Sequence, residues 1–152
     1  MHRIVFICHG NICRSPMAEF VLKDMVKKRG IADDFFIESR ATSTEEIGNP
    51  VHYGTQRKLS QFGISTAGKT AIQLRKSDYE RYDMLICMDS ANVRNTLRII
   101  GSDREEKVTK LLSFAGEGGD IADPWYTGNF DDTYDDVLRG CKGLLSHLGY
   151  NE

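Results

Sequence analysis

Residues 4–18 read IVFICHGNICRSPMA, in which an apolar run, a polar loop and a helix start follow one another directly. The run at residues 4–7 is typical of a buried strand, and Pro16 is favoured in the first turn of a helix. Between them, Gly10 and Asn11 tolerate the positive φ angles that a tight loop needs. A strand, a tight loop and a helix N-terminus together point backbone N–H groups at an anion. The segment therefore predicts a phosphate-binding loop after the first strand.

The same loop carries groups that can react with a bound phosphate. Cys8 stands at the end of the strand and Arg14 at the start of the helix, with five residues between them. A free cysteine thiol, with a pKa of ~8.5, is mostly protonated at neutral pH, whereas inward N–H groups, the helix dipole and a guanidinium favour the thiolate. A guanidinium also matches two oxygens of a phosphoryl group. We expect Cys8 to be the nucleophile, Arg14 to bind the phosphoryl group, and Ser15 both to cap the helix and to donate to the sulfur.

Three further segments extend the pattern of the loop CHGNICRS: Glu38-Ser39, residues 85–89 (LICMD) and Asp123-Pro124-Trp125-Tyr126. Together these segments resemble the low-molecular-weight protein tyrosine phosphatases, and the resemblance covers nearly the whole chain. It implies an enzyme that hydrolyses phosphotyrosine and other aryl phosphomonoesters through a phosphocysteine intermediate, without a metal or cofactor. It also implies that Cys8, Arg14 and Asp123 are the catalytic residues.

Asp123 is the candidate for the general acid that this reaction needs. Expelling a phenolate, whose conjugate acid has a pKa of ~10, is slow unless an acid donates a proton as the bond breaks. The same carboxylate can then act as the base that activates water, and Pro124 favours an extended backbone at Asp123. On spacing alone Asp120, Asp131 or Asp132 competes, although the last two are more typical of a helix N-terminus. The family resemblance selects Asp123.

The resemblance also indicates residues that support the loop and line its rim. Asn11 and Ser39 resemble a polar network in which the asparagine holds the loop and bonds to the serine. Cys13 either forms a reversible disulfide with Cys8 or packs as a thiol under the loop, and both interpretations stay open. The expected phosphate-binding and supporting residues are His9, Gly10, Asn11, Ile12, Cys13, Ser15 and Ser39, and the expected substrate rim is Glu45, Trp125 and Tyr126.

The expected rim has an aromatic side and an acidic side. Trp125 and Tyr126 stand where the best-known members of the family carry two tyrosines, and an aromatic wall can hold a flat phenyl ring. The segment Thr44-Glu45-Glu46 is acidic where some members place an aromatic residue. We expect this acidity to disfavour acidic peptides and to admit basic ones.

Three other activities are compatible with a loop that begins with cysteine. Arsenate reductases of similar sequence pass electrons through two further cysteines. Here Arg94 stands where a second cysteine near Cys87 could be placed, which argues against a reductase. Relatives that hydrolyse phosphoarginine tend to carry threonine at the position of Ile12. The bulkier isoleucine of this chain favours phosphotyrosine. A phosphocysteine carrier needs no distant general acid, so an Asp123→Asn variant distinguishes a carrier from a phosphatase.

Length and composition limit the remaining possibilities. The chain has 152 residues and a net charge of -2, which suits a single domain over residues 1–152 and argues against a general nucleic-acid surface. Four cysteines without paired spacings indicate neither a disulfide scaffold nor a zinc site, and a catalytic thiol requires a reducing compartment. The apolar stretch near the N-terminus is too short for a signal peptide, and no later run approaches a membrane span. We expect a cytoplasmic monomer that binds a phosphotyrosine protein or a small aryl phosphate, and neither nucleic acid nor membrane.

Strand and helix patterns alternate along the chain. Strands are expected at residues 3–8, 35–38, 84–88 and 108–112, and helices at 16–29, 51–62, 90–100 and 130–148. Such alternation predicts an α/β fold of three layers, with a central four-stranded parallel sheet and helices on both faces. Ligands of such sheets bind at the carboxyl ends of the strands. Cys8 and Asp123 both follow strands and can therefore meet at that edge.

The remaining cysteines and histidines have weaker patterns. Cys87 and Cys141 are expected in the core, on a buried strand and a helix. His9 is expected at the rim and, as the one histidine near the loop, is not a credible metal ligand. The other histidines are expected at the surface: His2, His52 and His147.

Overall fold

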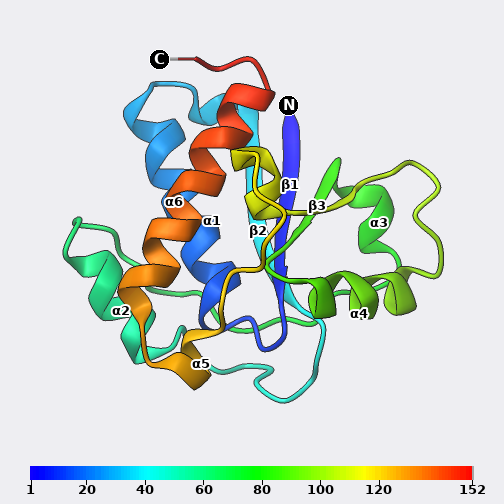
Figure 1. Cartoon of the computed structure of the whole chain (residues 1–152), viewed down its shortest axis with the longest axis horizontal. Helices are drawn as coiled ribbons and strands as arrows, with labels where there is room; N and C mark the ends of the chain where they lie inside the picture. Colours follow the sequence, from blue (N-terminus) through cyan, green and yellow to red (C-terminus); the bar gives the residue numbers. More distant parts are fainter. Residues whose placement is uncertain (152) are drawn as a thin grey trace.

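Four parallel strands form the centre of the molecule. In the computed structural model, which describes residues 1–151, the strands are β1 (His2–Cys8), β2 (Phe35–Ala41), β3 (Met84–Cys87) and β4 (Val108–Lys110). They lie side by side in the order β2-β1-β3-β4, and every pairing is parallel. Figure 1 shows β1, β2 and β3 running downward, so that their carboxyl ends gather at one end of the molecule. The four-stranded parallel sheet expected from the sequence is confirmed.

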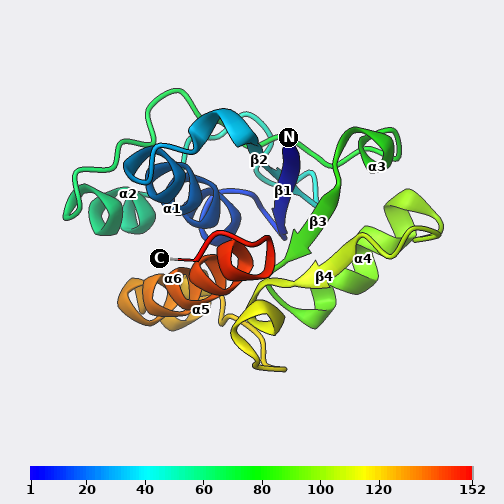
Figure 2. The same ribbon diagram turned by 90° about the horizontal axis from the view of Figure 1, so that it is seen from above.

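Helices cover both faces of this sheet and give three layers. Figure 2 shows α1 (Arg14–Lys28) and α6 (Phe130–His147) on one side, and α3 (Asp78–Arg81) and α4 (Ser90–Ile100) on the other. Successive side chains of β1 point to opposite faces of the sheet, so the strand contributes to a hydrophobic core on each face. Ile4 and Phe6 pack in the core under α1 and α6, whereas Val5 and Ile7 pack in the core on the opposite face. α2 (Tyr53–Ser60) packs beside α1 and α6.

Three short elements have no counterpart in the expected pattern, in addition to α3. They are the 3₁₀ helices η1 (Ala32–Asp34) and η2 (Leu111–Ala115), and α5 (Pro124–Thr127). The expected last strand reached residue 112, but β4 ends at Lys110, because the apolar residues that follow turn into η2 and pack against α6. β2 is longer than expected and continues to Ala41, in parallel register with the end of β1.

The start of α1 differs from the expectation. The helix begins at Arg14, and Cys13 occupies the N-cap position without a side-chain hydrogen bond to the helix. The prediction that Ser15 caps the helix is therefore wrong. The Ser15 hydroxyl lies 3.0 Å from the sulfur of Cys8 and accepts from the amide of Asn11 at 2.8 Å, so it is turned toward the loop.

The other long elements lie close to their expected bounds. α4 has the bounds that the pattern predicts, with a capping box at Asp89 and Gly101 after its last turn at a φ of 87°. Cys87 and Cys141 are buried, as expected. Within residues 1–151, no helix combines the length and the apolar character that crossing a membrane requires.

Candidate active site

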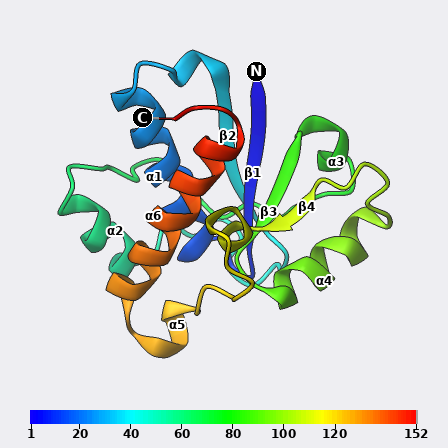
Figure 3. The same ribbon diagram turned by 45° about the horizontal axis from the view of Figure 1, so that its top comes forward.

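The loop of residues 8–15 borders a cavity of about 110 Å³ at the end of β1. Figure 3 shows α5 at this same end of the molecule, below the strands and α6. The cavity is lined by Cys8, His9, Gly10, Ile12, Cys13, Arg14, Glu45, Glu46, Asp123, Trp125 and Tyr126. Three of the predicted site residues do not line it and are buried: Asn11, Ser15 and Ser39.

The sulfur of Cys8 has two hydrogen-bond partners within the loop. The backbone N–H of Asn11 donates to it at 3.3 Å, and the hydroxyl of Ser15 lies 3.0 Å away. Asn11 can direct its N–H toward the sulfur because its backbone is left-handed, with a φ of 56°. The N–H of Asn11 is thus a backbone donor held against this sulfur by the shape of the loop.

Arg14 is a buried cation, only 2% exposed, with partners on three sides. One guanidinium nitrogen donates to the carboxylate of Asp89 at 2.7 Å and to the carbonyl of Ile121 at 2.9 Å. The other lies 3.5 Å from a carboxylate oxygen of Asp123. Burial lowers the pKa of Arg14, but the charges of Cys8 and the two aspartates outweigh burial, so that the pKa is raised and the cation is retained.

Asp89 was not among the expected site residues. It follows β3 and caps α4, so its position at the carboxyl end of a buried strand is the signal that could have indicated it. One of its oxygens accepts from the backbone of Asn92 at 2.7 Å, and the other holds Arg14. Asp89 therefore fixes the orientation of the guanidinium beside the cavity.

Asp123 reaches the cavity from the far end of the chain. The buried Ile121 anchors this segment, because its N–H donates to the carbonyl of Met88 at 2.9 Å, directly after β3. One carboxylate oxygen of Asp123 accepts from the N–H of Trp125 at 3.0 Å, and Asp123 is the N-cap of α5. The carboxylate thus lies beside Arg14 and lines the same cavity as Cys8.

A chain of buried polar side chains supports the loop from behind. The amide of Asn11 donates to the hydroxyl of Ser39 at 2.9 Å, and that hydroxyl donates to Glu19 at 2.5 Å. Lys69 donates to the carbonyl of Ser39 at 2.9 Å, with its nitrogen 3.9 Å from Glu19. Burial lowers the pKa of Lys69, and the charge of Glu19 opposes that shift.

Glu19 and Lys69 were missed by sequence reasoning. Glu19 lies four residues after Ser15 on α1, so helical spacing could have placed it on the face behind the loop. Lys69 stands in a long connection after α2, and no local pattern predicts its contact.

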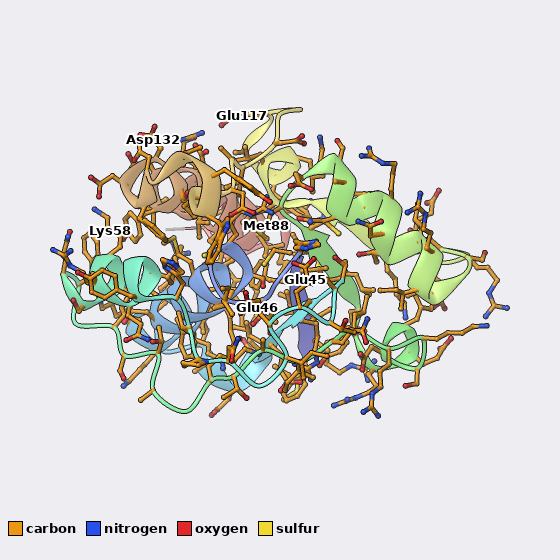
Figure 4. The ribbon with its side chains drawn as sticks, turned by 90° about the horizontal axis from the view of Figure 1, so that it is seen from below. Glu45, Glu46, Lys58, Met88, Glu117 and Asp132 are labelled. Carbon is orange, nitrogen blue, oxygen red and sulfur yellow. The ribbon has the colours of Figure 1, made fainter. Side chains whose placement is uncertain are left out.

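The rim of the cavity has an acidic side and an aromatic side. The ring of His9 and the carboxylate of Glu45 lie 2.9 Å apart. Figure 4 looks at the end of the molecule where the strands finish, and places Glu45 and Glu46 near its centre. Trp125 and Tyr126 are 56% and 84% exposed, so aromatic surface is available beside the opening.

Cys13 lines the cavity as a neutral thiol. Burial raises its pKa to about 12, and the charges of Cys8 and Asp123 add to that effect. All four cysteines are free. Within residues 1–151, no three His, Cys, Asp or Glu side chains are grouped to bind a metal ion.

The first strand of this α/β sheet ends in a cysteine, and the loop after it leads to a buried arginine that lines the same cavity. Comparison with known sequences identifies the class of protein to which this arrangement belongs. The chain belongs to the low molecular weight phosphotyrosine protein phosphatase family, whose profile matches residues 3–152. It is therefore a protein phosphatase, a hydrolase.

Individual relatives match along nearly their whole length. The Bacillus subtilis low molecular weight protein-tyrosine-phosphatase YfkJ is 35% identical over 97% of this chain and 96% of its own. The crystal structure of YfkJ superimposes with a TM-score of 0.93 over 97% of this chain and 94% of that one. PtpA of Staphylococcus aureus is 37% identical over 95% of this chain and 92% of its own. The structure of SP-PTP from Streptococcus pyogenes is 42% identical, with a TM-score of 0.88 over 97% and 93% of the two chains.

Proposed function

We propose that the protein hydrolyses phosphotyrosine and other aryl phosphomonoesters through a phosphocysteine intermediate. Cys8 is the nucleophile, Arg14 binds the phosphoryl group, and Asp123 is the general acid and then the general base. The observation that carries the proposal is that these three side chains, from β1, α1 and the segment before α5, line one cavity.

In the first step, the thiolate of Cys8 attacks phosphorus and the P–O bond to the phenol breaks. The N–H of Asn11 and the hydroxyl of Ser15 support the sulfur from behind, at 3.3 and 3.0 Å. The leaving phenolate takes a proton from Asp123, which is worth ~10²–10⁴ in rate for a general acid. Arg14 can pair with the transferring oxygens while Asp89 holds it at 2.7 Å.

In the second step, water attacks the phosphocysteine. Asp123, now a carboxylate, accepts a proton from the water, the S–P bond breaks, and Cys8 leaves as a thiolate with inorganic phosphate as the product. The groups that support the sulfur in the first step stabilise the same thiolate when it leaves. The same side chains therefore serve both steps.

The substrate meets the rim on its way to the phosphate loop. We assign Trp125 and Tyr126 as an aromatic wall for the phenyl ring, supported by their exposure beside the cavity. His9 and Glu45 form the opposite side, and Asn11 and Ser39 hold the loop shape through their 2.9 Å bond. The substrate is a phosphotyrosine protein or a small aryl phosphate, and a single domain over residues 1–152, working as a cytoplasmic monomer, is sufficient for this reaction.

Cys8 is also proposed to be redox-sensitive. A peroxide would oxidise its thiolate to a sulfenic acid with loss of water or alcohol, and the Cys13 thiol could then condense with the sulfenic acid, releasing water and forming a disulfide. The support is that Cys8 and Cys13 line one cavity as free cysteines.

The test of the proposed function is an Asp123→Asn variant assayed with two aryl phosphates. Phenyl phosphate has a strongly basic leaving group, and p-nitrophenyl phosphate has a weakly basic one. We expect kcat/KM for phenyl phosphate to fall by ~10²–10⁴, and by much less for p-nitrophenyl phosphate, because only the basic phenolate needs the proton.

Cys8→Ser is the matched control and should abolish turnover of both substrates. The same preparation should be offered phosphoserine, phosphoarginine and arsenate, and phosphotyrosine should be the preferred substrate. Unchanged turnover of phenyl phosphate by Asp123→Asn would exclude Asp123 as the acid. Vigorous activity of Cys8→Ser would exclude Cys8 as the nucleophile.

A further inference from the structure

A histidine outside the predicted site connects the phosphate loop to the segment that carries Asp123. The backbone N–H of His52 donates to the carbonyl of Ile12 in the loop at 2.8 Å. Its ring lies edge-on to that of Trp125, with centroids 5.5 Å apart, and is stacked on that of Phe130 at 5.3 Å. His52 is partly exposed, so the expectation of a surface residue holds only in part, because its ring also contacts two aromatic side chains.

The ring of His52 is held in place by its own neighbours. Its Nδ1 accepts from the N–H of Gly54 at 3.0 Å, so His52 is the N-cap residue of α2. Phe130 closes on the same turn, since a Cβ atom at Gly54 would lie 2.3 Å from the phenyl ring. The imidazole is thus fixed between the first turn of α2 and the start of α6.

The opposite partner, α5, has fewer anchors. It has only four residues, and Trp125 within it is 56% exposed. An element with so few buried contacts opens easily unless specific neighbours hold it. Figures 1 and 3 show the lower end of α2 close to α5, which agrees with the contact between His52 and Trp125.

We propose that His52 is a positioning residue for Asp123. The two are linked through Trp125, whose ring meets the imidazole and whose backbone N–H donates to the carboxylate at 3.0 Å. Because the backbone of His52 is bonded to Ile12, the ring contact fixes the acid relative to the phosphate loop. The inference rests on the proposed role of Asp123 as the general acid.

Two variants separate the ring of His52 from its capping nitrogen. His52→Asn keeps a side-chain acceptor for the N–H of Gly54 and removes the ring, since asparagine is a good N-cap residue. His52→Phe keeps an aromatic ring beside Trp125 and Phe130 and removes the acceptor. Both are assayed as the full chain, with phenyl phosphate and p-nitrophenyl phosphate, and their melting temperatures are measured.

The readout is the ratio of kcat/KM for phenyl phosphate to that for p-nitrophenyl phosphate. A displaced acid lowers this ratio, whereas a weaker aromatic wall or partial unfolding lowers both values alike. We expect His52→Asn to lower the ratio about tenfold, within the ~10²–10⁴ that the acid supplies, while its melting temperature stays near that of the wild type. We expect His52→Phe to keep the ratio within about twofold and to melt a few degrees lower, because the cap is lost.

Asp123→Asn is the reference that separates the two proposals. If it lowers the ratio and His52→Asn does not, His52 has no positioning role while the proposed function stands. An equal loss on both substrates in His52→Asn also overturns the inference, because it indicates a structural role alone. If Asp123→Asn itself leaves the ratio unchanged, the proposed function fails and this inference fails with it.

Discussion

Cys8 and Cys13 belong to one loop but lie in different surroundings. The sulfur of Cys8 has a backbone N–H and a hydroxyl as partners, at 3.3 and 3.0 Å. Burial raises the pKa of Cys13 to about 12, and the charge of Cys8 adds to this. At neutral pH Cys13 is therefore a thiol, and a thiol is a weaker nucleophile than a thiolate. The two sulfurs therefore have different contacts, although the two residues are only five positions apart in one short motif.

This difference predicts the outcome of oxidation. Cys8 is expected to react first with hydrogen peroxide, and the Cys13 thiol then to trap the sulfenic acid as a disulfide that dithiothreitol reverses. After peroxide followed by dithiothreitol, the wild type should regain most of its activity and Cys13→Ser much less, because its Cys8 proceeds to the sulfinic acid. Equal recovery in the two proteins would mean that Cys13 protects nothing and packs only as a thiol.

α6 and η2 approach each other so closely that the helix carries glycine at the contact. A Cβ atom at Gly143 would lie 2.1 Å from the carbonyl oxygen of Phe114, and one at Gly140 would lie 2.4 Å from the side chain of Leu111. Glycine is otherwise unfavourable inside a helix by about 1 kcal/mol relative to alanine. Its presence twice on one helix face is thus explained by packing against η2.

The packing predicts that Gly143→Ala destabilises the protein despite the better helix propensity of alanine. The backbone of Phe114 would have to move, and overpacking of this kind is typically unfavourable by ~1–3 kcal/mol. Urea unfolding should show this loss. Gly118→Ala is the matched control, since a Cβ atom there meets nothing within 4 Å and its stability should stay within about 0.5 kcal/mol. A Gly143→Ala variant as stable as the wild type would contradict the close contact between α6 and η2.

The strands and the long helices could be predicted from the sequence, and the short helices could not. α4 was predictable to the residue because Asp89 and Gly101 mark its two ends. β1 was predictable to within one residue because it contains a continuous apolar run. α3 and α5 have four residues each, fewer than two helical turns, so no periodicity can indicate them. The start of α1 was misplaced because Ser15, a typical cap residue, instead contacts the sulfur.

At the scale of the whole molecule, the site joins segments that the parallel sheet brings together. The pattern of strands was enough to expect Cys8 and Asp123 at one edge, because carboxyl ends of parallel strands meet there. Other residues, which contact the loop, Arg14, Ser39 or Trp125, were not predictable, since they come from separate connections. Asp89 follows β3, Lys69 follows α2, and His52 stands in the loop before α2. Only the packed structure relates these positions to the loop.

The central claim is that the reaction passes through a phosphoryl group on Cys8. The most direct measurement is a rapid acid quench of Asp123→Asn with p-nitrophenyl phosphate, followed by peptide mass spectrometry. This variant should accumulate the phosphocysteine. Its formation from p-nitrophenyl phosphate needs little help from an acid, whereas its hydrolysis has lost the base that activates water. We predict one phosphoryl group, located on Cys8 and absent in Cys8→Ala. Turnover without a trapped phosphoenzyme, or with the phosphoryl group on another residue, would contradict the account.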